Sequence, residues 1–323
     1  MTAPKIFLVG CPRSGTTMLR LMLDAHPSLA IPPESHFIPL VARVRSRYEA
    51  GDAFDAERMA RDVAKTLRFA DWQLPPEAVF AEIARSRPRD LAGAIEAFFV
   101  AYAGAHGKER WGDKTPGYSI EMPLIASLFP DARFVHLVRD GRNVALSLME
   151  VPRPPRSFAE AAQVWATRIR VARRDAKALE GSMLEIRYED LVDDPETALK
   201  QICGHVELDW DEAMLEYHRG DPSAAVPERN WGHHRNLAKP PTRGLREWRE
   251  SMTRQDQELF EAIAGEELTA LGYERRFPET TTTARTLALV NTAYDGIRHR
   301  MRAGRIRAAM MRNREALPPP RRW

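Results

Sequence analysis

Nine residues near the N-terminus, Val9 to Thr17 (V-G-C-P-R-S-G-T-T), have the types and spacing of an anion-binding loop. The apolar run Lys5 to Val9 predicts a buried strand before them, and Met18 to Asp24 predicts a helix after them. A glycine-containing loop between a strand and a helix points consecutive backbone N–H groups into one concavity, and the helix start adds about half a positive charge. The segment is therefore expected to bind a phosphate or sulfate group.

This loop departs from a nucleoside-triphosphate P-loop at one position. Gly10 and Gly15 have the G-x-x-x-x-G spacing, but Thr16 stands where lysine normally follows. Arg13 is the only fixed cation within the loop. A smaller anion held by backbone N–H groups, by Arg13 and by hydroxyls therefore fits better than a nucleoside triphosphate with Mg²⁺. The hydroxyls belong to Ser14, Thr16 and Thr17.

A second pair of residues follows the predicted strand Arg133–Val138. Arg139 stands at its carboxyl end, and Ser147 lies eight residues further on, in a predicted helix over Asn143–Glu150. Open α/β sheets bind ligands at the carboxyl ends of their strands, so the pair could hold a second phosphate. The plainer alternative is an ion pair between Arg139 and Asp140 at the strand end, with a surface serine. Arg139 also stands where a Walker-B strand would end in an acidic residue.

The elements that must position these residues alternate along the chain. A third strand is expected at Met183–Ile186, and strands separated by helices predict an α/β fold with a P-loop-like parallel sheet flanked by helices. The predicted domain covers 1–284 and includes a mostly helical insertion at about 37–110. Residues 285–323 are expected to form a basic amphipathic C-terminal helix and tail.

Composition narrows the class of protein further. A chain of 323 residues with 44% apolar residues can bury one large core or one core with a helical annex. The net charge of +3 gives no indication of nucleic-acid binding, yet residues 285–323 carry ten Arg against Asp295 and Glu315, a local charge of +8. Two cysteines, Cys11 and Cys203, provide no disulfide framework. With neither a long apolar stretch nor a signal-peptide pattern, a cytoplasmic location is expected.

Two motifs together resemble a known family. The run P-R-S-G-T-T-M-L-R-L-M-L-D-A-H-P resembles the 5′-phosphosulfate loop of sulfotransferases that use 3′-phosphoadenosine-5′-phosphosulfate (PAPS), closest to the branch that includes protein-tyrosine sulfotransferases and bacterial homologues. V-R-D-G-R followed by Ser147 resembles the 3′-phosphate motif of that family, with its spacing preserved. The resemblance covers roughly 5–275. It implies PAPS as donor, 3′,5′-bisphosphoadenosine as product and no metal.

Glu34 is the leading candidate for a general base. It lies in I-P-P-E-S-H, directly after the first helix, where proline removes competing N–H donors. In the protein-tyrosine branch, the Glu at the same distance from the loop arginine acts as the base, and here Arg13 precedes Glu34 by 21 positions. His36 is the rival, since other sulfotransferases use histidine. A solvated surface carboxylate is the alternative without function.

The resemblance assigns further residues. Lys114, in W-G-D-K-T-P, is similar to the lysine that contacts the transferring group, and it shares with Arg13 the expected role of stabilising the leaving phosphate. Tyr188 in I-R-Y-E-D-L and Lys239 in L-A-K-P are similar to residues near the nucleotide. Trp231 or Arg235 are candidates for adenine contact. The chain departs from the branch at Val151, where arginine is expected, and Arg153 is a possible substitute.

Three questions stay open from the sequence. The acceptor could be a glycan, a lipid, a natural product or a tyrosyl peptide, because each presents a hydroxyl. The C-terminal helix could dock on the body or on a second copy in a homodimer, or lie on the inner face of an anionic membrane. A P-loop small-molecule kinase and a non-catalytic, membrane-associated nucleotide-binding module are the alternative functions.

Overall fold

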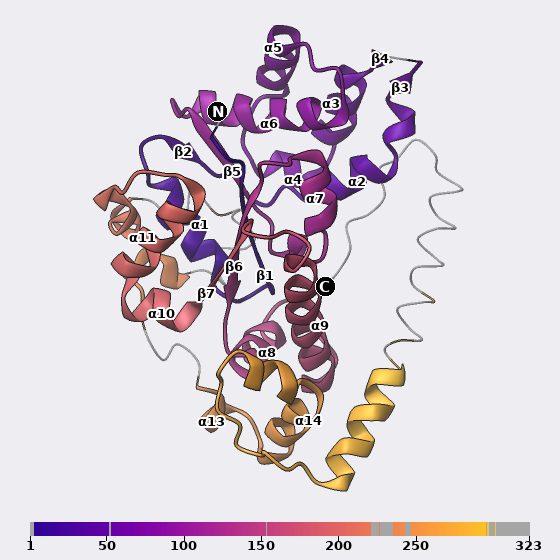
Figure 1. Cartoon of the computed structure of the whole chain (residues 1–323), viewed down its shortest axis with the longest axis vertical. Helices are drawn as coiled ribbons and strands as arrows, with labels where there is room; N and C mark the ends of the chain where they lie inside the picture. The colour runs from indigo at the N-terminus through magenta and orange to yellow at the C-terminus, as the bar shows by residue number, and fades with distance from the viewer. Residues whose placement is uncertain are drawn as a thin grey trace.

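A five-stranded parallel sheet forms the centre of the protein (Figure 1). The computed structural model describes residues 3–51, 53–152, 154–220, 226, 235–242, 247–294, 296 and 301. The strands run in the order β2-β5-β1-β6-β7, and their pairings are parallel. The bounds are β1 (Ile6–Gly10), β2 (Leu29–Ala30), β5 (Arg110–Lys114), β6 (Arg133–Val138) and β7 (Met183–Arg187). The predicted α/β class with a P-loop-like parallel sheet is therefore confirmed.

Helices cover both faces of this sheet, because alternate side chains of each strand enter different apolar layers. In β1, Ile6 and Leu8 belong to the layer under α1, α10 and α11, whereas Phe7 and Val9 belong to the opposite layer. The flanking helices are α1 (Thr16–Asp24), α7 (Met122–Leu128), α8 (Gly141–Met149), α9 (Phe158–Ala176), α10 (Tyr188–Asp193) and α11 (Pro195–Val206). Figure 1 shows α1, α10 and α11 on one side of the strands and α7 and α9 on the other.

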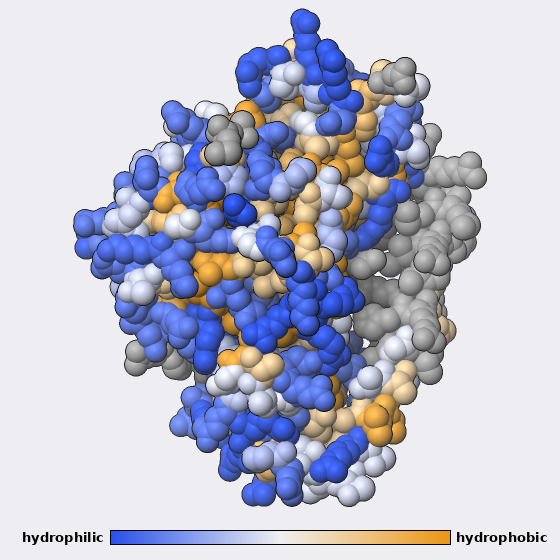
Figure 2. Space-filling view, viewed as in Figure 1, coloured by the Kyte–Doolittle hydropathy of each residue, from blue (hydrophilic) through white to orange (hydrophobic). Residues whose placement is uncertain are grey.

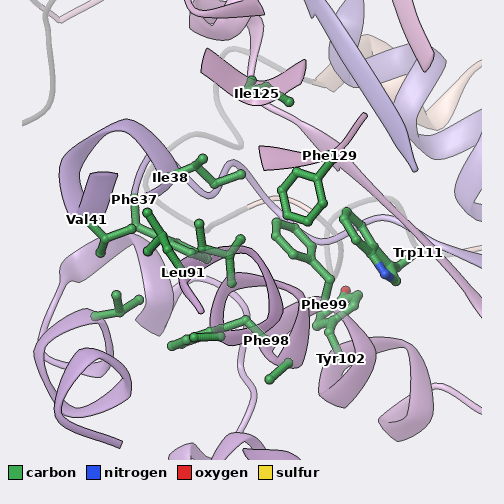
Figure 3. Close-up of a cluster of buried hydrophobic side chains, with 14 of the residues drawn as sticks. Phe37, Ile38, Val41, Leu91, Phe98, Phe99, Tyr102, Trp111, Ile125 and Phe129 are labelled. Atoms are coloured by element: carbon green, nitrogen blue, oxygen red, sulfur yellow. The ribbon is translucent and has the colours of Figure 1, made fainter. Parts of the chain in front are cut away.

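The helical insertion between β2 and β5 shares an aromatic core with one face of the sheet (Figure 3). Its helices are α2 (Ile38–Arg43), η1 (Arg45–Arg47), α3 (Ala56–Ala64), α4 (Leu67–Ala70), α5 (Pro76–Ser86) and α6 (Leu91–Ala105). Phe99 of α6 stacks on Trp111 of β5, with ring centroids 4.5 Å apart and planes inclined by 15°. Because β5 also carries Lys114, this stacking fixes the insertion relative to the carboxyl edge of the sheet.

The C-terminal part of the domain packs against α8 and α9. Its helices are α13 (Trp248–Ser251) and α14 (Arg254–Ala270), and the short 3₁₀ turns are η2 (Pro116–Ile120), η3 (Glu212–Met214), η4 (Tyr217–Arg219) and η5 (Arg235–Ala238). Thr253 caps α14 by accepting a hydrogen bond from the Asp256 N–H at 3.1 Å. Trp165 of α9 lies 6.1 Å from Phe260 of α14 between ring centroids.

A further helix, residues 282–294, lies against α9 and is called here the C-terminal helix. Its small residues Ala284 and Ala288 are buried, and Gln163 of α9 donates a hydrogen bond to the Thr292 hydroxyl at 3.2 Å. Among the described residues, no helix has the length and apolar character needed to span a bilayer.

The structure contains four strands that the sequence did not indicate. β5 has the sequence R-W-G-D-K, whose charged residues hide a strand that is almost entirely buried. β2 is two residues long and pairs with β5. A two-residue antiparallel hairpin, β3 (Glu49–Ala50) with β4 (Ala53–Phe54), interrupts the stretch expected to be helical.

Candidate active site

The anion loop between β1 and α1 has the backbone shape that a cradle requires. Gly15 precedes the first residue of α1 with a φ of +97°, and Arg13 has a φ of +75°. A Cβ at Gly15 would lie 2.4 Å from Cδ2 of Tyr188, so the tyrosine ring packs directly on the glycine. Glycine is therefore required at this position both by the left-handed backbone and by the close ring.

Arg13 joins this loop to the second anion motif. Its Nε donates a hydrogen bond to the Ser147 hydroxyl of α8 at 2.9 Å. β1 and β6 are adjacent strands in register, with Gly10 opposite Leu137, so the two loops that leave them are neighbours. The sequence placed Arg13 and Ser147 in separate phosphate motifs, and the structure brings their side chains into contact.

Arg139, the other cation of the second motif, is 6% exposed and lies over the Tyr188 ring at 4.2 Å from its centroid. Its backbone carbonyl accepts a hydrogen bond from Trp165 Nε1 at 3.1 Å. Tyr188 thus contacts Gly15 of one loop and Arg139 of the other. It is the first residue of α10, directly after β7.

Buried charges fix the start of α8, which carries Ser147. Arg142 pairs with Asp140 at 2.8 Å and with Glu261 of α14 at 2.7 Å, and its guanidinium lies 3.6 Å from the centroid of Trp248. These groups are almost fully buried, so the carboxylates neutralise a guanidinium that water cannot reach. Asp140, which the alternative interpretation paired with Arg139, pairs with Arg142.

Glu34, His36 and Lys114 form one hydrogen-bonded group beside the anion loop. Lys114 Nζ donates to Glu34 Oε1 at 2.9 Å and approaches the Thr17 hydroxyl at 3.4 Å. His36 Nε2 lies 2.7 Å from the other carboxylate oxygen, Oε2. The two rival bases of the sequence analysis therefore touch each other, and both lie close to the residue expected to stabilise the leaving group.

Burial and charge shift the pKa values of this group. Burial raises the pKa of Glu34, but the Lys114 charge, the hydrogen bond from His36 and the charges of His36 and Arg68 together hold it well below its usual value. Burial lowers the pKa of Lys114, which is 4% exposed, and the Glu34 carboxylate opposes that shift. Asp113, one residue earlier in β5, has its pKa raised by burial to about 6.

The comparisons with known proteins agree with this geometry. The sequence model of the Sulfotransferase family matches residues 4–212, which is more than half of the chain. The chain belongs to the sulfotransferase family. That match includes both anion loops, Glu34 and Lys114.

Relatives and solved structures of this family extend the match. The chain is 26% identical over 225 residues to protein-tyrosine sulfotransferase A of Caenorhabditis elegans, covering 67% of this chain and 53% of that protein. It is 27% identical over 296 residues to nodulation protein NoeE of Sinorhizobium fredii, covering 83% and 66%. The sulfotransferase domain of an olefin synthase from Synechococcus PCC 7002 superposes with a TM-score of 0.56 at 26% identity, covering 84% and 95%. The chain thus spans about half of the length of the worm protein.

Of the remaining residues predicted for this sulfotransferase-family site, Lys239 is the one whose surroundings the structure describes. Lys239 is exposed, and its backbone carbonyl accepts a hydrogen bond from the Tyr217 hydroxyl at 3.1 Å. Trp231, Arg153 and the side chain of Arg235 lie outside the described residues. Among the described residues, no group of three His, Cys, Asp or Glu side chains could hold a metal ion.

Several contacts near the site were not predicted from the sequence. Ser35, between Glu34 and His36, donates its N–H to the Thr115 hydroxyl at 3.0 Å and shares a hydrogen bond of 2.9 Å with the Tyr118 hydroxyl. Arg68 of α4 brings a charge from the insertion that acts on Glu34. The polar residues in the segments P-P-E-S-H and K-T-P-G-Y are the only sequence signal for these contacts.

Proposed function

We propose that the protein transfers a sulfuryl group from PAPS to a hydroxyl acceptor, with Glu34 as general base. One observation carries the proposal, namely the 2.9 Å contact between Arg13 and Ser147. It supports a single ligand with two anionic ends, because it puts both anion motifs within reach of one nucleotide. The kinase alternative lacks the lysine that a P-loop places after its second glycine, where this chain has Thr16.

The residues present fit such a donor. The loop N–H groups, Arg13 and the hydroxyls of Ser14, Thr16 and Thr17 would hold the 5′-phosphosulfate. The buried Ser14 hydroxyl has no hydrogen-bond partner among the described residues, as expected of a group kept for an anion. Arg139 and Ser147 would hold the 3′-phosphate. Tyr188 contacts the inner side of both loops, and Lys239 is proposed to approach from the exposed loop after η5.

The chemistry assigns one role to each side chain. The donor supplies the sulfuryl group: the acceptor oxygen bonds to sulfur, the bond from sulfur to the 5′-phosphate oxygen breaks, and the electron pair leaves with the phosphate. Glu34 takes the proton of the acceptor hydroxyl, for which a positioned base contributes about 10²–10⁴-fold. Lys114 and Arg13 stabilise the charge that develops on the leaving phosphate, each contributing about 10²–10³-fold.

Two measurements test this function. Calorimetry should show that 3′,5′-bisphosphoadenosine binds far more tightly than ATP with Mg²⁺. Glu34→Gln should lower sulfuryl transfer about 10²–10⁴-fold without weakening nucleotide binding. Glu109→Gln, at an exposed carboxylate, is the matched control and should change neither. Tight ATP binding that ignores the 3′-phosphate would point to the kinase, and undiminished transfer by Glu34→Gln would exclude Glu34 as the base.

The acceptor class follows less directly from the site. The name of the worm relative supports a tyrosyl peptide, and the charge of Arg68, which acts on Glu34 from the helical insertion, supports an acceptor chosen by that insertion. Glycans, lipids and natural products carry hydroxyls of the same reactivity. A screen of acceptor pools with sulfur-labelled PAPS distinguishes these classes, because the labelled product identifies its own chemistry.

We also propose that the protein is cytoplasmic and contacts the inner face of an anionic membrane through the C-terminal helix. The large apolar side chains that the described residues expose are Leu67, Leu287, Leu289, Val290, Tyr294 and Met301. All but Leu67 lie in or just beyond this helix, where Figure 2 shows apolar surface at the lower right. The charge of +8 over 285–323 complements anionic lipid.

Vesicle sedimentation tests the membrane contact. The protein should bind vesicles that contain phosphatidylglycerol and not vesicles of phosphatidylcholine alone. Replacing both Leu289 and Val290 with Gln should abolish binding, whereas Leu67→Gln, which removes an equally exposed leucine elsewhere, should leave it intact. If the double variant instead converts a dimer to a monomer in light scattering, the helix is a homodimer interface and the membrane proposal fails.

A further inference from the structure

Both oxygens of the Glu34 carboxylate are engaged, and by groups of different mobility. Oε1 accepts from Lys114 Nζ at 2.9 Å, and Oε2 lies 2.7 Å from His36 Nε2. A carboxylate held by a cation and a hydrogen bond is a weak proton acceptor. In this arrangement the proposed base is poorly prepared to take the proton of a hydroxyl.

The His36 side of the carboxylate is held by the backbone. His36 has a φ of +55°, which is uncommon for a residue with a side chain and persists only where the surroundings enforce it. Ser35 anchors the segment through Thr115 and Tyr118, and the Ile38 N–H donates to the same Tyr118 hydroxyl at 3.2 Å. The contact from His36 to Oε2 is therefore built into a rigid turn.

On the other side of the carboxylate, Lys114 is shared between Glu34 and the anion loop. Besides Glu34, the ammonium reaches the Thr17 hydroxyl at 3.4 Å, in the first turn of α1. An ammonium is a compact charge with three donors, so it can exchange one anionic partner for another. An anion in the loop would compete with Glu34 for it, because opposite charges in contact attract strongly where water is largely excluded.

We propose that the 5′ anion of the donor releases Glu34 Oε1 by drawing Lys114 to itself, while His36 keeps Oε2 in place as a positioning residue. Oε1 then becomes the atom that accepts the acceptor proton. The inference rests on the proposed function and adds to it a condition: the base is prepared only when the donor is bound. It also resolves the rivalry between the two candidate bases, since His36 acts through Glu34.

The charged groups around Glu34 support this direction of change. Lys114 faces it from β5, His36 from its own turn and Arg68 from α4, while the charges of Asp113 and of Arg20 in α1 act on Lys114. Lys114 is the foremost of the charges that lower the pKa of Glu34, and burial is the opposing influence. Removal of Lys114 from Oε1 therefore moves the pKa of Glu34 upward, toward that of an effective base.

Carbon-13 NMR of labelled glutamate side chains tests the release directly. The pKa of Glu34, assigned through Glu34→Gln, is measured with and without 3′,5′-bisphosphoadenosine. We expect a rise of at least about one unit in the wild type. Lys114→Met measures the direct repulsion from the nucleotide, so its rise should be clearly smaller and should start from a higher value. Equal rises in both proteins would overturn the proposal.

The pH profile of sulfuryl transfer tests the positioning role. His36→Ala should move the acid limb of the kcat profile to higher pH and lower kcat about 10-fold or more, with donor affinity unchanged. His36→Gln, which restores a donor N–H at similar reach, should bring the acid limb back. A purely structural histidine would lower the melting temperature in both variants and leave the acid limb in place. Because nucleotide binding is measured in the same samples, failure of the proposed function would show as absent binding, and failure of this inference as binding without these shifts.

Discussion

Gly15 is a position where both the backbone conformation and the packing require glycine. Its φ of +97° and a ring carbon of Tyr188 at 2.4 Å from a virtual Cβ leave no room for a side chain. We expect Gly15→Ala to lower the free energy of unfolding by about 1–3 kcal/mol and to weaken 3′,5′-bisphosphoadenosine binding at least 10-fold, because Tyr188 must move from between the two anion loops.

Thermal denaturation and calorimetry measure both effects. Gly104→Ala is the matched control, since nothing lies within 4 Å of its virtual Cβ and it stands in α6. That variant should gain up to about 1 kcal/mol of stability from helix propensity. A Gly15→Ala protein that binds nucleotide normally would mean that the loop is not shaped by Tyr188.

The raised pKa of Asp113 predicts that the free energy of unfolding falls as the pH rises. Burial raises its pKa from 3.8 to about 6, so the folded protein holds a proton that the unfolded chain releases between those values. The stability therefore decreases through this window, by about 3 kcal/mol at most, and the full loss is present at pH 7. Asp113→Asn should remove this dependence and raise the melting temperature at pH 7.

The Glu34 carboxyl group should change the free energy of unfolding with pH in the opposite direction. The pKa of Glu34 is held well below its usual value of 4.5, so its contribution to stability is present above that pH and is lost as the pH falls through the depressed pKa. Glu34→Gln should therefore lose stability at pH 7 relative to the wild type. Melting curves of both variants from about pH 2 to pH 8, a range that extends well below the usual pKa of Glu34, check the two signs together.

Among the elements, α8 depends on a buried ion network for its position. Arg142 is 1% exposed and pairs with both Asp140 and Glu261. Arg142→Met would remove the cation from Asp140 and leave Glu261 with its longer pair to Arg275 at 3.9 Å, at a cost of about 3–5 kcal/mol in the free energy of unfolding. Because α8 carries Ser147, nucleotide affinity should fall in the same variant.

The surface pair of Arg85 with Glu82 on α5 provides the control for this prediction. Both variants remove one arginine from an ion pair of 2.7 Å, but the Arg85 side chain is 71% exposed. Arg85→Met should leave the melting temperature almost unchanged, since water solvates the freed carboxylate. Chemical denaturation of the two variants separates burial from pairing, and equal losses of stability would contradict the argument.

The same elements show what the sequence could and could not predict. The strand Arg133–Val138 was predicted to the residue, because β6 is an apolar run between turn signals. β5 was missed because Asp113 and Lys114 are charged, and their burial depends on partners from the 34–38 turn and from α1. A local pattern cannot indicate a strand whose polar residues are satisfied by distant segments.

At the scale of the whole molecule, the sheet order decided what could be inferred about the site. Residues at the carboxyl ends of β1 and β6 were expected at one edge because parallel strands share that edge. That β1 and β6 are adjacent, and that Arg13 therefore reaches Ser147, depends on an order in which β5 lies on the other side of β1. The sequence contains no signal for that order, so it could not indicate that Arg13 of one anion loop contacts Ser147 beside the other.

Adjacency of β1 and β6 leads to a prediction about how the two ends of a nucleotide combine. Five register pairs, from Ile6 with Arg133 to Gly10 with Leu137, hold the two loops at a fixed separation before any ligand binds. A preformed site loses no free energy in bringing its halves together, so the two phosphates should contribute to binding almost additively. Adenosine 5′-phosphate, adenosine 3′-phosphate and 3′,5′-bisphosphoadenosine measure the two contributions and their sum by calorimetry. Each phosphate should strengthen binding about 10- to 100-fold, as charge-assisted hydrogen bonds of about 1.5–3 kcal/mol imply.

Arg139→Met should remove the gain from the 3′-phosphate and leave the affinity for adenosine 5′-phosphate nearly unchanged, because Arg139 belongs to the loop after β6. If that variant weakens adenosine 5′-phosphate as much as the bisphosphate, the loops do not divide the nucleotide between them, and the sheet edge must bind it in another orientation.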